Sequence, residues 1–170
     1  MPHPKLQKFT VLLFVLCLAA ALYGCGFRLR GTADLPSAMR VTCIEGVRPH
    51  GTLAVDFAAM LRLRNIDVTD DCSFATATLR ISNNNVEKLV VSVDTAGNVQ
   101  EYEIRQTIVF SVQATDGSIV VNEQQVTLGR DYIFSSTDVL GKTREEQVVR
   151  ATLQKNLVNL AMLRISAAAR

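Results

Sequence analysis

The segment QEYEIRQTIVFSVQA, residues Gln100–Ala114, decides the fold of this chain. Its apolar side chains recur at alternate positions, and the positions between them are mainly polar. The apolar set consists of Tyr102, Ile104, Ile108, Phe110, Val112 and Ala114. Such alternation predicts a β-strand with one buried face and one exposed face.

Turn residues on both sides of this segment predict two β-hairpins. Thr95–Asn98 precedes it and Asp116-Gly117 follows it. Gly, Asn and Asp tolerate the positive φ angles of tight turns. We therefore expect one antiparallel strand to precede the segment and another, over Ser118–Tyr132, to follow it, so that three consecutive strands form a meander.

The strand before the central segment is expected to be irregular. It begins near Ala75, and its apolar residues lie in two groups separated by the polar stretch Asn83–Asn85. The two groups are Ala77, Leu79 and Ile81, and then Leu89, Val91 and Val93. A break of this kind predicts a bulge or a bend.

Four further segments complete the expected order of elements. Met39–Glu45 alternates like a half-buried strand, and residues 52–65 have the apolar spacing of an amphipathic helix. The polar residues 67–73 predict a loop. Thr143-Arg144-Glu145-Glu146 has the pattern of a helix capping box, so we expect a long final helix from Thr143 almost to Arg170.

The order strand, helix, strand, strand, strand, helix predicts an α+β fold of two layers. We expect a four-stranded, mainly antiparallel sheet with two helices on one face and the other face exposed. A single domain over residues 38–170 accommodates these elements, because a mature chain of about 146 residues can bury one hydrophobic core.

The amino-terminal residues 1–24 have the pattern of a lipoprotein signal peptide. Lys5 and Lys8 precede an apolar stretch that ends in Leu22-Tyr23-Gly24-Cys25. We expect Cys25 to be lipidated and to begin a leader over residues 25–37 that ties the domain to a membrane. The alternatives are a transmembrane anchor and an ordinary signal peptide, although the apolar stretch is short for a spanning helix.

The charge of the mature chain argues against nucleic-acid binding. The 18 Lys and Arg residues include Lys5 and Lys8 of the signal, which leaves 16 basic residues against 16 acidic ones. The basic residues are scattered and form no stripe with interleaved aromatic side chains.

Two cysteines, Cys43 and Cys72, remain in the mature domain once Cys25 is assigned to lipid. Export places them in an oxidising compartment, where they can form a disulfide. The alternative is that Cys43 is a small buried residue and Cys72 a free thiol in a loop.

The sequence contains no recognisable catalytic or metal-binding motif. His50 has no carboxylate or cysteine at ligand spacing, so we expect no metal and no cofactor. Neither a Gly-x-Ser-x-Gly elbow nor a phosphate-binding loop is present. These observations favour a protein that is not an enzyme.

The mature amino terminus resembles that of one lipoprotein family. Cys25-Gly26-Phe27-Arg28-Leu29-Arg30-Gly31, followed by Leu35-Pro36, is similar to the start of the LPS-assembly lipoproteins of the LptE family. Four later segments resemble, in order, the family's central strand, last strand, loop and final helix. They are Gln100–Ile104, Asp131–Phe134, Leu140–Lys142 and Glu145–Gln147.

The resemblance implies a non-catalytic lipoprotein at the periplasmic face of the outer membrane. Gly26 fits this location, because an aspartate after the lipidated cysteine retains many lipoproteins at the inner membrane. The implied partners are an LptD-like β-barrel, which the protein plugs and helps to assemble, and lipopolysaccharide, which it binds for insertion into the outer leaflet. A lipid-anchored periplasmic adaptor or binding protein for another envelope machine is the alternative.

The resemblance also indicates candidate residues for binding lipid A phosphates. Lys142, in the loop before the final helix, matches a basic residue of the family. A second basic position of the family falls in the turn Val93–Asn98, which has no positive charge here. Lys88 or Arg105 is a candidate to replace it. All three residues are alternatively solvated surface charges.

The polar face of the central strand is the candidate surface for the barrel. A protein inside a barrel lumen meets mostly polar walls. The candidate residues are Glu101, Glu103, Arg105, Thr107, Ser111 and Gln113. The alternative is an ordinary solvated sheet face.

Overall fold

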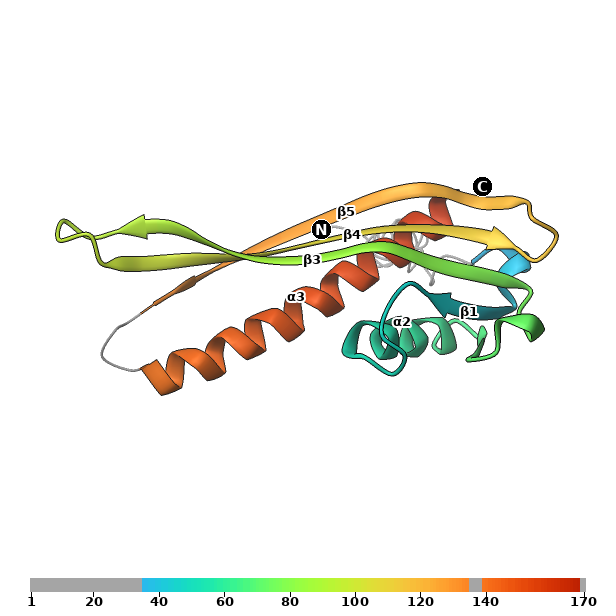
Figure 1. The fold of residues 1–170 in the computed structure, drawn as a ribbon, viewed down its shortest axis with the longest axis horizontal. Coiled ribbons are helices and arrows are strands. Elements are labelled where there is room, and N and C mark those ends of the chain that lie inside the picture. Colours follow the sequence, from blue (N-terminus) through green and yellow to red (C-terminus); the bar gives the residue numbers. More distant parts are fainter. Residues whose placement is uncertain (1–34, 135–138, 169–170) are drawn as a thin grey trace, which may run out of the picture. The chain divides into compact units, whose positions relative to one another are not determined.

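A computed structural model of the chain describes residues 35–134 and 139–168 (Figure 1). All of them belong to one unit, Thr32–Arg170. The expected signal peptide, Cys25 and most of the expected leader lie outside the described residues.

The described part of the chain forms one mixed sheet of five strands and two α-helices. The strands lie in the order β2-β1-β3-β4-β5. The strands are β1 (Val41–Glu45), β2 (Asp67–Thr69), β3 (Ala77–Val93), β4 (Val99–Ala114) and β5 (Ile119–Ile133). The helices are α2 (Thr52–Arg62) and α3 (Val139–Ala168), with short 3₁₀ turns η1 (Ser37–Met39) and η2 (Cys72–Phe74).

The central meander agrees with the sequence analysis. Strands β3, β4 and β5 pair antiparallel over most of their length. The turn before β4 has Gly97 at φ 84°, and the turn after it has Gly117 at φ 87°. Asp94 and Asp116 each accept backbone hydrogen bonds within their own turns, which is why these short polar segments reverse the chain.

The prediction of a four-stranded, mainly antiparallel sheet was wrong in part. The sheet has a fifth strand, and two of its four strand pairs are parallel. Strand β2 pairs parallel with β1, and β1 pairs parallel with β3. The prediction of a loop over residues 67–73 was wrong for Asp67–Thr69, which form β2. Three residues without clear alternation carry no strand signal, and β2 forms as an edge strand only because α2 returns the chain beside β1.

The predicted irregularity in β3 is a bulge at Ser82. Ile81 pairs with Phe110, but Asn83 pairs with Val109, so Ser82 is the extra residue. Its hydroxyl lies within hydrogen-bonding distance of the Val109 carbonyl and the Glu123 carboxylate. The bulge moves β3 out of phase by one residue.

Before the bulge, the odd-numbered side chains of β3 lie on the helix side of the sheet. Directly after it, the even-numbered ones do. Lys88 pairs with Ile104, which is fully buried, and Val90 pairs with Tyr102. The side chains of Asn84, Val86, Lys88 and Val90 therefore lie on the helix side of the sheet. Leu89 pairs with Glu103 and lies on the opposite side, and two further register shifts follow between Val90 and Val93, where Val91 and Val93 are half exposed.

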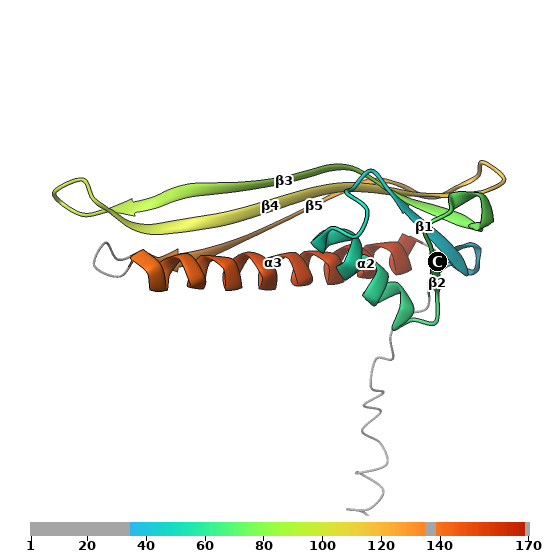
Figure 2. The ribbon, with the colours of Figure 1, turned by 60° about the horizontal axis from the view of Figure 1, so that its bottom comes forward.

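Both helices cover the same face of the sheet, as predicted (Figure 2). Helix α2 covers the end that contains β1, whereas α3 runs along the long strands. Their apolar faces and the inner face of the sheet form the main core, which includes Phe57, Leu61, Phe110, Leu157 and Met162. No helix in the described ranges has an apolar stretch long enough to span a membrane.

Helix α3 begins at Val139, four residues before the predicted start. Thr143 therefore lies inside the helix and is not its N-cap. The capping-box prediction was wrong because four helical residues precede Thr143, and the Glu146 side chain contacts Lys88 and Tyr132 on the sheet.

A disulfide joins β1 to η2. The Cα atoms of Cys43 and Cys72 are 5.1 Å apart, and the bond closes a sequence separation of 29 residues. Cys43 is buried in the sheet, whereas Cys72 lies in the turn that follows β2. The bond therefore holds the parallel half of the sheet together at its edge.

Replacing Gly46 with Ala tests the contact between β1 and the bulge. Gly46 has φ 83°, and an added Cβ would overlap the carbonyl oxygen of Ile81. We expect the free energy of unfolding to fall by about 3 kcal/mol, since a left-handed residue alone costs about 1 kcal/mol. Gly97→Ala, at φ 84° with nothing within 4 Å, is the matched control and should cost only about 1 kcal/mol. Equal losses in urea titrations would contradict the steric explanation.

The disulfide is tested by alkylating the denatured, non-reduced protein and mapping the labelled peptides by mass. Cys43 and Cys72 should remain unlabelled until a reductant is added. Loss of the loop constraint in Cys72→Ser should lower the free energy of unfolding by about 3 to 4 kcal/mol. Labelling of both residues without reduction would show that the mature protein keeps them as thiols.

Candidate functional site

Four side chains from three elements meet around one carboxylate, and we call them the Glu146 cluster: Lys88, Tyr132, Glu146 and Arg150. Lys88 Nζ and the Tyr132 hydroxyl each donate to Glu146 Oε2 over 2.7 Å. Arg150 donates from Nε to Oε1 over 2.8 Å. The Glu146 side chain is only 20% exposed, so these contacts are largely shielded from water.

Aromatic rings enclose the cation of this cluster. Lys88 Nζ lies 4.1 Å from the ring centroid of Tyr102 and 5.5 Å from that of Tyr132. Tyr102 stacks on Tyr132 and meets Phe134 edge to face. The negative faces of aromatic rings attract a cation, so they help to hold the ammonium group in place.

The cluster lowers the pKa of the Glu146 carboxylate. Burial alone would raise the pKa of Glu146, but the hydrogen bonds from Lys88, Tyr132 and Arg150 together outweigh it and lower the pKa to about 2. Burial likewise opposes the charged form of Lys88, yet the contacts with Glu146 and Tyr132 leave its pKa above the usual value. Both groups are therefore charged at neutral pH.

Local sequence explains how each member reaches the cluster. The Ser82 bulge turns Lys88 toward α3, and alternation in β4 and β5 places Tyr102 opposite Tyr132 on the same side. Glu146 and Arg150 are four residues apart in α3, a spacing that places them on one helix face. Sequence analysis missed Tyr132, Glu146 and Arg150. The Glu146–Arg150 spacing was the one signal that pointed to them.

The structure does not bring the three predicted phosphate-binding residues together. Lys88 lies on the helix side of the sheet, whereas Arg105 lies on the opposite side and forms a two-pronged ion pair with Glu103 at 2.7 and 3.0 Å. Lys142 falls within α3 and not in a loop, and its side chain lies outside the described residues. The loop position predicted for Lys142 was wrong because α3 starts earlier than its capping pattern indicates.

The proposed partner residues share one face of β4, and no described helix covers it (Figure 2). Glu101, Glu103, Thr107, Ser111 and Gln113 alternate with the buried residues of the strand. Several are engaged across this face: Thr107 bonds to Thr127 over 2.9 Å, and Ser92 reaches Glu101 over 3.5 Å. We call this surface the uncovered face.

Gly129 makes room for the ion pair on the uncovered face. It lies opposite Arg105 in β5, and an added Cβ would overlap the Glu103 carboxylate. The Glu103 side chain therefore lies directly over the backbone of β5. This close approach explains a glycine in the middle of a long strand.

A groove of about 500 Å³ adjoins the Glu146 cluster on the helix side. Its walls come from α2, α3, β3 and β4, and they are mainly apolar. The groove is lined by Thr52, Val55, Asp56, Val86, Ile104, Gln106, Gln147, Arg150, Ala151, Leu153, Gln154 and Lys155. Arg150 belongs to both the groove and the cluster, so the two features are continuous.

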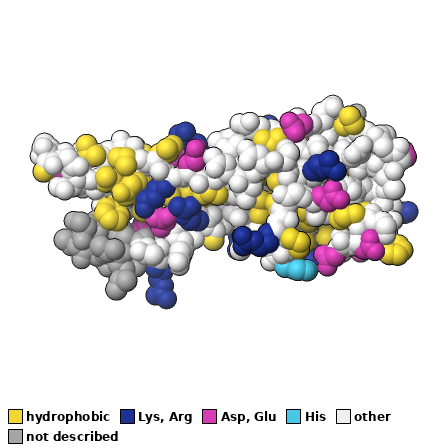
Figure 3. All heavy atoms as spheres, viewed as in Figure 1, with side chains coloured by type: hydrophobic (Ala, Val, Ile, Leu, Met, Phe, Trp, Pro, Cys, Tyr) yellow, Lys and Arg dark blue, Asp and Glu magenta, His cyan; other side chains and the backbone are white. Residues whose placement is uncertain are grey.

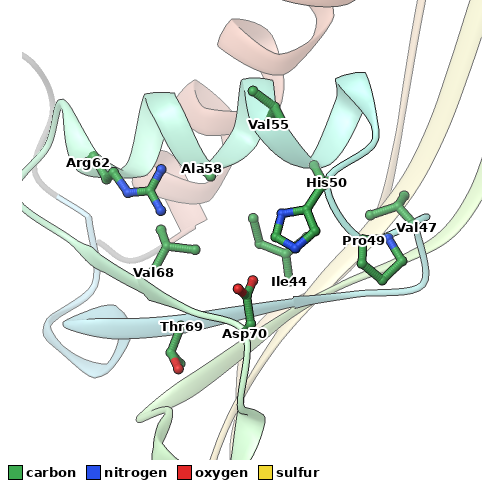
Figure 4. Close-up of a pocket in the computed structure, with 11 residues that line it drawn as sticks. Ile44, Val47, Pro49, His50, Val55, Ala58, Arg62, Val68, Thr69 and Asp70 are labelled. Carbon is green, nitrogen blue, oxygen red and sulfur yellow. The ribbon is translucent and has the colours of Figure 1, made fainter.

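A smaller pocket of about 220 Å³ lies between α2 and the strands β1 and β2 (Figure 4). His50 and Asp70 point toward each other across it, and Arg62 lies at its far end. Of the described residues, one group has the spacing of metal ligands: Cys43, Glu45 and Cys72. Because the two cysteines are joined in a disulfide, their sulfurs lack the thiolate charge that binds metals.

Apolar side chains gather at the outer end of the long hairpin, beside the charges of the cluster (Figure 3). Val90, Val91, Val93 and Ile133 are each at least half exposed. This end of the molecule thus combines exposed apolar surface with a compact set of ionic groups.

Comparison with known proteins gives one consistent family. The family model described as LptE, Lipopolysaccharide-assembly, matches residues 45–165. An LPS-assembly lipoprotein LptE from Photorhabdus laumondii is 28% identical over 146 residues, which cover 86% of this chain and 78% of the relative. A protein of the same name from Yersinia pestis is 29% identical and is covered to 69%, against 86% of this chain.

Solved lipoprotein structures have the same fold. An uncharacterized lipoprotein B from Nitrosomonas europaea superposes with a TM-score of 0.68 at 23% identity and covers 84% of this chain and 91% of its own. The rare lipoprotein B from Shewanella oneidensis gives 0.63 at 22% identity, with 75% and 94% covered. At these identities the likeness concerns the fold.

The depressed pKa of Glu146 predicts a pH-dependent contribution to stability. Glu146→Gln should lower the free energy of unfolding at pH 7 by about 1 to 3 kcal/mol, because hydrogen bonds to a charged group are lost. The wild-type contribution is complete above the ordinary pKa of 4.5 and disappears as the pH falls through about 2. The difference between wild type and variant should therefore shrink between these pH values in urea titrations.

The matched control is Glu145→Gln, which removes the same charge from the neighbouring, exposed position of α3. Its effect at pH 7 is the reference for the loss of one carboxylate charge from α3 and should be smaller than that of Glu146→Gln. A wild-type advantage over Glu146→Gln that stays constant from pH 7 to pH 2 would contradict the assignment.

Proposed function

The chain belongs to the LptE family of lipopolysaccharide-assembly lipoproteins, which are not enzymes, and on this premise we propose that it plugs an LptD-like β-barrel and binds lipopolysaccharide. In this proposal Cys25 carries the lipid anchor that holds the domain at the periplasmic face of the outer membrane. The barrel receives the sheet, and lipopolysaccharide binds to basic residues before it enters the outer leaflet.

The observation that carries the barrel proposal is the uncovered face. It is broad because β3, β4 and β5 run antiparallel for 15 or more residues each. Its side chains on β4 are polar or charged except for Val109, and Arg105 is paired there with Glu103. Such a surface suits the polar wall of a barrel lumen, where an apolar face would be poorly solvated.

Basic residues on both sides of the sheet support binding of lipid A phosphates. Lys88 and Arg150 lie together on the helix side, and their charges are shared with one carboxylate. Arg105 has its own acidic partner, Glu103, so it is a weaker candidate than Lys88. Lys142 keeps its candidate role from its match to the family's basic position.

Co-purification tests the barrel proposal. Thr107→Trp places a bulky side chain on the uncovered face, and it should reduce recovery of the barrel from outer-membrane extracts by about tenfold if this face is central to the contact. Thr152→Trp places the same side chain at an exposed position of α3 and should leave recovery unchanged. Recovery of no large barrel with the wild type would contradict the proposal, and equal recovery with both variants would contradict the assignment of the face.

Depletion of the protein distinguishes the proposal from the alternative of an adaptor for another envelope machine. If the protein serves lipopolysaccharide assembly, lipopolysaccharide at the cell surface should fall as the protein is depleted. Normal surface lipopolysaccharide, together with recovery of a different envelope complex, would favour the adaptor.

A further inference from the structure

We propose that Lys88, Tyr132 and Arg150 form a phosphate-binding site that the Glu146 carboxylate masks in the free protein, and that the adjoining groove takes an acyl chain of the same phosphorylated lipid. This inference rests on the proposed binding of lipopolysaccharide.

The geometry of the Glu146 cluster is that of an occupied anion site. Three donors from separate elements converge on two oxygens of one anionic group over 2.7 to 2.8 Å. Charge-assisted bonds from ammonium and guanidinium groups to phosphate oxygens have the same lengths. A phosphate group presents at least as many acceptor oxygens and an equal or greater negative charge, so it can replace the carboxylate with the same donors.

The Glu146 carboxylate can leave the three donors that hold it. It is held by Lys88 and Tyr132 of the sheet and by Arg150 of its own helix. Rotation of the Glu146 side chain alone frees all three donors and leaves α3 and Arg150 in place. A ligand that enters the site must therefore displace the carboxylate from these donors, and the free energy of those contacts is subtracted from its affinity.

The groove supplies the second half of the site. Val55, Val86, Ile104, Ala151 and Leu153 give it apolar walls, and Arg150 lies at its junction with the cluster. Val86 and Ile104 also border Lys88, by sequence and by strand pairing respectively. An apolar groove that ends at a cationic group is complementary to an acyl chain with an anionic head, and burial of its methylenes adds affinity that free phosphate lacks.

The test uses the mature, lipidated protein in phosphatidylcholine nanodiscs, with dioctanoyl phosphatidic acid and inorganic phosphate as separate probes in calorimetric titrations. Empty nanodiscs give the background from lipid partitioning. Glu146→Gln should tighten binding of phosphatidic acid on the order of tenfold, because the charged competitor is gone. Glu145→Gln removes the same charge beside the site and should change the affinity by less than about twofold.

Two further variants test the donors and the groove. Lys88→Gln should weaken phosphatidic acid binding on the order of tenfold, because one charge-assisted bond is lost. Ala151→Trp fills the groove, so in the Glu146→Gln background it should abolish the preference for phosphatidic acid over inorganic phosphate. Thr152→Trp adds the same bulk at the next, exposed position and should preserve the preference. Circular dichroism and thermal melts check that each variant is folded.

Unchanged affinity in folded Glu146→Gln would overturn the masking, and unchanged affinity in Lys88→Gln would overturn the site itself. Equal affinity for phosphatidic acid and inorganic phosphate in Glu146→Gln would overturn the role of the groove. Lipopolysaccharide binding by the wild type is measured in parallel. If it binds while these variants have no effect, the inference fails and the proposed function stands; if it does not bind, the proposed function itself fails.

Discussion

The arrangement of this protein depends on one extra residue in β3. Because Ser82 has no partner in β4, the side chains from Asn83 to Val90 lie on the face opposite to the one that simple alternation assigns. Lys88 is thereby directed toward α3 and Leu89 away from it. Without the bulge, the sheet would place Lys88 on the uncovered face and an apolar row against the helix.

The bulge is held at the point where the two halves of the sheet meet. Gly46 follows β1 and packs against the backbone of Ile81, directly before the bulge, at a distance that excludes any side chain. On one side of this contact the sheet has five strands, α2 and the disulfide. On the other side, three long strands are supported by α3, and the ionic contacts of Glu146 join that helix to the sheet.

The two sides of the sheet serve different physical purposes in the proposed function. The helix side carries the core, the apolar groove and a carboxylate shared by three donors, which makes it suited to an amphiphilic anion. The uncovered face carries mainly polar side chains on β4 and a closely held ion pair over Gly129. A protein that contacts a polar barrel wall on one face and a lipid on the other requires such a division.

The sequence by itself determined the meander, the two helices and their common face, because alternation in β4, glycine turns and helical apolar spacing are local properties that persist in the fold. It also indicated the family and a break in β3. It did not predict β2, whose three residues become a strand only beside β1. Nor did it predict the Glu146 cluster, because its members are far apart in the chain, and the face on which Lys88 lies depends on the phase of the bulge. Those features were decided by the tertiary structure, because only pairing between strands and packing of α3 sets which distant side chains share a site.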